Sequence, residues 1–61
     1  MAVEMYKDVD TGVVSAKDTI IDDLVDVFRN DDDEITFEEA TEAAIEMFAN
    51  MVEAGALVEV E

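Results

Sequence analysis

Cysteine and histidine are both absent from this chain of 61 residues. Without cysteine the chain has no disulfide, no thiolate nucleophile and no Cys/His zinc site, and without histidine it lacks the commonest general base. A domain this small has a small core and often depends on a disulfide, a metal or self-association for stability. Self-association is the stabilising device that this composition leaves open, so we expect a homodimer.

Basic residues are almost as scarce. Lys7, Lys17 and Arg29 are the only three cations against 18 Asp and Glu, which gives a formal net charge of −15. That charge repels phosphates and anionic lipids, so we expect neither direct nucleic-acid binding nor membrane binding. No apolar run approaches the ~20 residues of a membrane span, and the first residues do not resemble a secretion signal. We therefore predict a cytoplasmic protein.

Proline, repeats and linker-like stretches are absent as well, while hydrophobic residues make up 51% of the chain. A disordered acidic tail would have far fewer, so residues 1–61 are predicted to form a single folded domain. Residues 3–6 alternate loosely between apolar and polar, which predicts a strand, or a small hairpin with Val13 and Val14 across a turn. Ser15 and Asp18 have the spacing of a helix cap and predict a helix over residues 16–28, whose apolar half, including Val27, is expected to face the core.

A second helix is predicted over residues 37–54. Thr36 and Glu39 repeat the capping spacing, and Gly55 suits the left-handed position that ends a helix. The alternating residues 57–61 predict a final strand. The order strand, helix, helix, strand indicates an α+β domain in which two helices pack on a short antiparallel sheet.

The helical wheel of residues 37–54 is unusually apolar. Its acids form one stripe, and roughly 200° of the wheel is left apolar or small, where a surface helix needs a stripe of about 100° or somewhat more. We expect the centre of this arc to face the core: Phe37, Ala40, Ala44, Phe48 and Met51. One flank is the candidate contact with a second copy: Ala43, Met47, Asn50 and Ala54. Asn50 either hydrogen-bonds across that contact or is a solvated amide.

Residues 28–39 resemble the calcium-binding loop of EF-hand proteins. The resemblance places Ile35 at the central apolar position, Glu39 at the closing ligand position, and Asn30 and Asp32 at inner ligand positions. Phe28 replaces the first Asp ligand of that family, and Asp33 replaces the glycine of its sharp turn. We therefore predict no metal site or cofactor, with Asn30, Asp32 and Glu39 as candidates for weak, nonspecific divalent-cation binding. Glu39 is interpreted as a helix cap.

Residues 51–60 resemble the end of a winged-helix recognition helix and its first wing strand. This resemblance implies a DNA-binding regulator with three helices. The sequence predicts two helices, the second with an acidic exposed stripe, and a glycine-capped helix followed by a strand explains the same residues.

No catalytic residues are predicted. Asp18, Asp22 and Asp26 recur at four-residue spacing on the polar side of their helix, with no apolar pocket implied to shift a pKa. Ser15 and the threonines have no histidine or placed lysine to activate them, and no Gly-rich phosphate loop is present. We therefore expect a protein without enzymatic activity.

Like charges at four-residue spacing destabilise a helix, so another interaction has to offset the repulsion within the acidic rows. Concentrated salt would supply one, and the abundance of Asp, Ala and Val with little Lys resembles small acidic proteins of halophilic archaea or their viruses. A basic partner would supply another if the acidic rows imitate a phosphate backbone, and residues 6–12 resemble the openings of short phage-encoded acidic proteins. The acids occur in every segment, which favours salt. We predict a salt-adapted, homodimeric protein-interaction module. The alternatives are a nucleic-acid-mimic inhibitor of a basic protein and, as a minor one, a winged-helix-like regulator.

Overall fold

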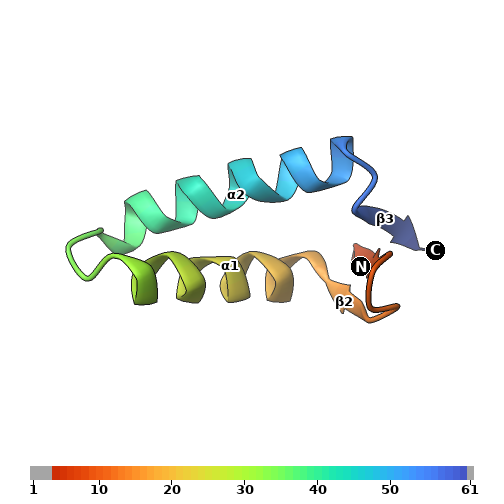
Figure 1. The fold of residues 1–61 in the computed structure, drawn as a ribbon, viewed down its shortest axis with the longest axis horizontal. Helices are drawn as coiled ribbons and strands as arrows, with labels where there is room; N and C mark the ends of the chain where they lie inside the picture. The colour runs from red at the N-terminus through yellow and green to blue at the C-terminus, as the bar shows by residue number, and fades with distance from the viewer. Residues whose placement is uncertain (1–3, 61) are drawn as a thin grey trace.

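The computed structural model describes residues 4–60, which form three strands and two helices (Figure 1). The strands are β1 (Met5–Asp8), β2 (Val14–Ala16) and β3 (Leu57–Val60), and the helices are α1 (Lys17–Asp31) and α2 (Phe37–Glu53). The predicted α+β class and the element order are confirmed. Val3 and Glu61, which the sequence placed in the end strands, lie outside the described residues.

The sheet is antiparallel with strand order β2-β1-β3. The predicted pairing of the first and last strands is confirmed, since Tyr6 lies opposite Glu59 and Asp8 lies opposite Leu57. The predicted hairpin is confirmed as well. Its turn closes at Gly12, which has a φ of 77° and donates its N–H to the carbonyl of Asp8 at 2.7 Å. That positive φ favours glycine because it has no Cβ to clash with the backbone.

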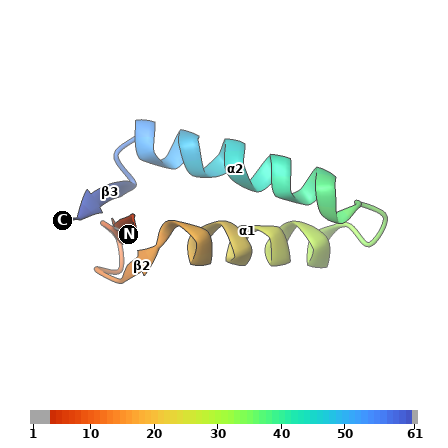
Figure 2. The same ribbon diagram turned by 180° about the vertical axis from the view of Figure 1, so that it is seen from behind.

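The two helices lie side by side and run in opposite directions. The sheet sits at the end where α1 begins and α2 finishes, and the loop between the helices forms the opposite end (Figures 1 and 2). Within residues 4–60 these are the two helices, whereas the winged-helix family needs three.

A small core joins the helices to the sheet. Val25 of α1 packs with Ala40 and Ala44 of α2, both completely buried, and partly buried apolar residues of α1 and the loop surround them. Nearer the sheet, the buried Phe48 meets the Tyr6 ring edge to face, with centroids 4.9 Å apart. The alanines let the helix backbones approach closely, and the aromatic pair ties α2 to the central strand.

The predicted cap at Ser15 is wrong. Ser15 lies in β2 opposite Tyr6, and α1 begins after Ala16, which provides no side-chain cap. The first helical N–H, that of Lys17, donates instead to the carbonyl of Glu4 at 2.9 Å. Hairpin pairing thus extends the strand over a residue whose local sequence favours a cap.

Two predicted helix-face assignments are also wrong. Phe37, expected in the core, is 61% exposed, and Val27, on the apolar half of the α1 wheel, is 60% exposed. Phe37 begins α2 at the end far from the sheet, where the Arg29 guanidinium lies over its ring at 5.7 Å from the centroid. A wheel shows the direction of a side chain but not whether another element reaches it.

The predicted start and end of α2 are confirmed. Glu39 donates its N–H to Thr36 Oγ1 at 3.1 Å, and this hydroxyl also donates to Glu39 Oε1 at 3.0 Å. At the other end Gly55 has a φ of 83° and donates to Val52, while Ala56 donates to Met51. This pair of bonds is the Schellman motif, which satisfies the last carbonyls of a helix.

Thr36→Ala is expected to destabilise the domain by about 1 kcal/mol, because it removes the oxygen that accepts from Glu39 N–H. For a domain of this size that lowers the melting temperature by roughly 4–8 °C. Ser15→Ala is the matched control, since Ser15 does not cap α1, and it should change the melting temperature much less. Equal shifts in thermal melts followed by circular dichroism would contradict this assignment.

Candidate functional site

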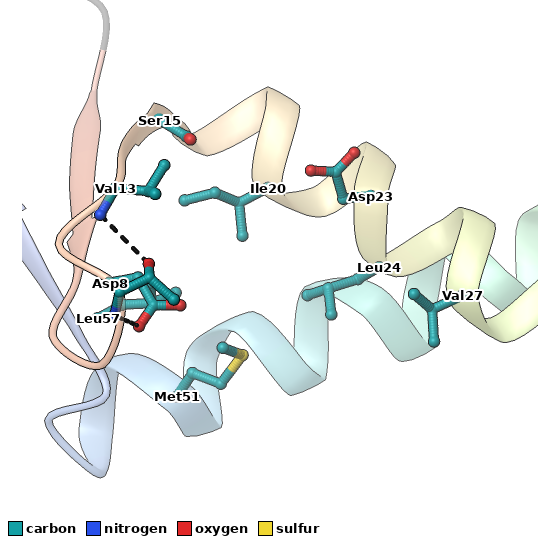
Figure 3. Close-up of a pocket in the computed structure, with 10 residues that line it drawn as sticks. Asp8, Val13, Ser15, Ile20, Asp23, Leu24, Val27, Met51 and Leu57 are labelled. Carbon is teal, nitrogen blue, oxygen red and sulfur yellow. Dashed lines mark hydrogen bonds between the residues drawn. The ribbon is translucent and has the colours of Figure 1, made fainter.

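A groove of about 310 Å³ opens where the β1–β2 hairpin, the start of α1 and the end of α2 meet (Figure 3). Its apolar walls come from three elements, α1, α2 and β3, and from the hairpin turn. The apolar lining residues are Val13, Ile20, Leu24, Val27, Met51 and Leu57. This volume is at the small end of the range for small-molecule pockets. Side chains of a protein partner are small enough to fill it.

The polar groups of the groove are hydroxyls and carboxylates. Asp8 and Ser15 lie on the hairpin side, and Asp23 lies on α1. Asp8 Oδ1 already accepts the Asp10 N–H at 2.8 Å, so this carboxylate holds the turn in place. The groove therefore combines an apolar floor with a polar edge, which is the usual composition of a protein contact surface.

The predicted contact flank of α2 adjoins this groove. Met47 is 40% exposed and lies one turn before Met51, which lines the groove. Ala43 is half-buried, and Asn50 and Ala54 are exposed. The flank is thus open in the monomer. We call Val13, Val27, Met47 and Met51, with Ala43, Asn50 and Ala54 beside them, the groove face.

Comparisons with known proteins do not identify the chain. No family model, curated protein or solved structure matches it significantly. The function therefore has to be argued from the groove face and from the charged surface.

In the acidic loop between α1 and α2, side chains hydrogen-bond with groups two or three residues away in the sequence. Asp32 Oδ1 accepts the Glu34 N–H at 3.0 Å, and the Glu39 carboxylate accepts from Thr36, so two of the EF-hand-like positions have local partners. Asn30 lies apart, in a shallow polar hollow with Asp26, Arg29 and Asp33. Among residues 4–60 no three Asp or Glu side chains are grouped so that they could hold a metal ion. The structure thus does not bring Asn30, Asp32 and Glu39 together as ligands.

The acidic surface has few protein partners. No Asp or Glu within residues 4–60 is buried, and one ion pair occurs in that part of the chain, between Lys17 Nζ and Glu4 Oε2 at 3.5 Å. Lys17 also lies over the Phe48 ring at 5.6 Å from its centroid. Within residues 4–60 the other carboxylates lie at the surface of both helices, the loop, the hairpin and β3, where ions in the solvent can reach them.

Sequence reasoning placed Ala43, Met47, Asn50 and Ala54 on an open flank of α2, but it assigned the groove-lining Met51 to the core and missed Val13 and Val27. Both are exposed, and the wheel and strand patterns of their own segments assign them to the interior. Their exposure depends on how the hairpin, α1 and α2 meet, which no local pattern encodes.

Proposed function

We propose that this chain is a non-enzymatic, salt-adapted protein-interaction domain of the cytoplasm that works as a homodimer, with two copies meeting at the groove face. The supporting observation is the apolar surface left open there. Val27, which lines the groove, and Met47, one turn before the lining residue Met51, are both exposed, in a chain with few buried hydrophobic residues. Exposed apolar patches on small proteins usually mark contact sites, and covering this one adds to a small core.

Helix pairing is the natural mode of this contact. α1 and α2 are already antiparallel neighbours, and a second pair laid on the groove face gives a four-helix arrangement (Figure 1). Ala43 and Ala54 are small enough for close backbone approach, and Met47 fits irregular gaps. Asn50, exposed at the margin, either hydrogen-bonds across the contact and sets its register or stays a solvated amide at its edge.

Salt adaptation accounts for the charge better than mimicry of a nucleic acid. A mimic concentrates its acids in rows on the face that its partner covers, whereas here exposed acids occupy both helices, the loop and the hairpin. One further observation concerns location: neither helix within residues 4–60 is long and apolar enough to cross a membrane.

Sedimentation in molar KCl tests this proposal, with a dimer expected for the unaltered chain. Met47→Glu is expected to give a folded monomer, because an unpaired carboxylate in a desolvated contact costs several kcal/mol, or ~100-fold or more in affinity. Ala49→Glu is the matched control. It adds the same charge to the same helix at an exposed position on the acidic side and should leave the dimer intact.

A folded monomer for the unaltered chain at all concentrations would contradict the proposal of self-association. A dimer that both variants leave intact would contradict the groove face as its contact. Circular dichroism of each variant verifies that the helices remain.

A further inference from the structure

The sheet has its apolar side outward. Opposed residues in an antiparallel pair point to the same face, so the register defines two cross-strand rows beside one another. These rows are Val14–Lys7–Val58 and Ala16–Met5–Val60. Tyr6 packs on Phe48 from the other face, so both rows point away from the helices. We call them the outer sheet face.

Side-chain exposure agrees with this orientation. Val14 is 46%, Val58 44% and Val60 36% exposed, and Lys7 is exposed between the first two. The face toward the helices carries Ser15, Glu59 and Asp8 besides Tyr6 and Leu57. An antiparallel sheet with one solvated face normally places polar residues on that face, and here the solvated face is the more apolar one.

Charge indicates what covers this face. The chain carries a net charge of −15, so most surfaces repel a second copy. The two rows of the outer sheet face contain no carboxylate and include one of the three cations, Lys7. A copy that approaches here meets the least like-charge repulsion. The aliphatic stem of Lys7 packs on the neighbouring valines, and its flexible side chain lets the ammonium reach out to solvent at the edge of the contact.

We propose that the outer sheet face is a second contact between two copies of this chain, separate from the groove face. This inference rests on the proposed self-association and extends it, because a chain that uses both faces assembles beyond a dimer. The face is small, so the contact is weak and depends on protein concentration. Salt strengthens it, since ions screen the surrounding acids while the valines remain apolar.

Single-cysteine variants test the contact directly, because the chain has no cysteine of its own. In a contact with two-fold symmetry, residues near the axis meet their own counterparts, and Lys7 lies in the middle strand of the face. Under oxidising conditions in molar KCl, Lys7→Cys is expected to form a disulfide-linked dimer. Ala49→Cys, exposed on the acidic side of α2 and away from the sheet, is the control and should cross-link at least ~10-fold less.

Met47→Cys, oxidised in parallel, separates this inference from the proposed function. If Lys7→Cys cross-links above the Ala49→Cys control, the outer sheet face is a contact, whatever Met47→Cys shows. If sedimentation gives a dimer and Met47→Cys alone cross-links, the inference is overturned and the proposed function stands. A monomer throughout, with neither variant cross-linking, overturns both.

A charge inside the contact provides a second measurement. Val58→Asp should reduce the sedimenting mass of the concentrated protein, whereas Ala49→Asp adds the same charge on the acidic side of α2, outside the face, and should leave that mass unchanged. An unchanged mass for a folded Val58→Asp variant would overturn the inference. The amide spectrum of each variant shows whether the fold survives.

Discussion

Phe48→Ala is expected to unfold the domain even in molar KCl. Removing a buried phenylalanine side chain costs about 3–5 kcal/mol, which is comparable to everything that a core in a chain of this length supplies. Phe48 also forms the edge-to-face pair with Tyr6 and lies under the Lys17 ammonium. Its loss therefore separates α2 from the central strand. Circular dichroism should show the helical signal lost or greatly reduced at 25 °C.

Phe37→Ala is the matched control, because it removes the same side chain from the same helix at an exposed position. The expected cost is about 0.5–1 kcal/mol, mostly from the lost contact with the Arg29 guanidinium. Urea melts of the two variants measure the difference. If Phe37→Ala were as damaging as Phe48→Ala, the loop end of the helix pair would have to be closed by contacts that the structure does not have.

The fold was predictable where the signals are local. Thr36 with Glu39 and Gly55 mark the ends of α2 through bonds that span a few residues, and the structure has these bonds. The order of elements and the pairing of the end strands followed from apolar patterns in short segments. The ends and the order of the elements need no knowledge of what lies across the fold, whereas the pairing of the end strands was inferred as the simplest arrangement that buries every apolar pattern.

The assignments that failed all depend on a distant neighbour. Ser15 has a capping sequence but is paired in the sheet with Tyr6. Phe37 is on the apolar side of its helix, but the sheet does not reach it. Among the aromatic and cation–π contacts within residues 4–60, Phe37 makes one, with the Arg29 guanidinium. A residue is buried only when a second element covers it, and the sequence of one segment does not specify that second element.

The two candidate contact surfaces also differ in how far they could be predicted from local sequence. Met47 was placed on an open flank from the α2 wheel, because that wheel is more apolar than its neighbours can cover. The outer sheet face was not foreseen, because its rows exist only once the register joins β1 to both neighbouring strands. A shift of one residue would turn its valines toward the helices.

The second large effect that we expect is a strong dependence of folding on salt concentration, because the surface is so acidic. At 0.01 M salt the Debye length is ~30 Å, comparable with the molecular dimensions of 37 × 27 × 17 Å, so every carboxylate repels nearly every other. At 1 M it falls to ~3 Å, shorter than the ~5–6 Å between neighbours on one helix face. We expect the chain to be unfolded in dilute buffer and to recover its helical signal in molar KCl.

Two charge-reducing variants identify which repulsion is responsible. Asp22→Asn with Glu42→Gln removes the central acid from the rows Asp18–Asp22–Asp26 and Glu38–Glu42–Glu46, each central acid having a like charge one turn away on both sides. Each such pair costs about 0.2–0.5 kcal/mol, so the KCl midpoint of folding should fall.

Asp33→Asn with Glu34→Gln removes the same charge from the exposed loop, outside both rows, and should lower the midpoint less. Equal shifts would mean that net charge alone sets the dependence on salt. No shift in either variant would mean that KCl acts by strengthening apolar burial, and the acids would then need an explanation other than screening by salt.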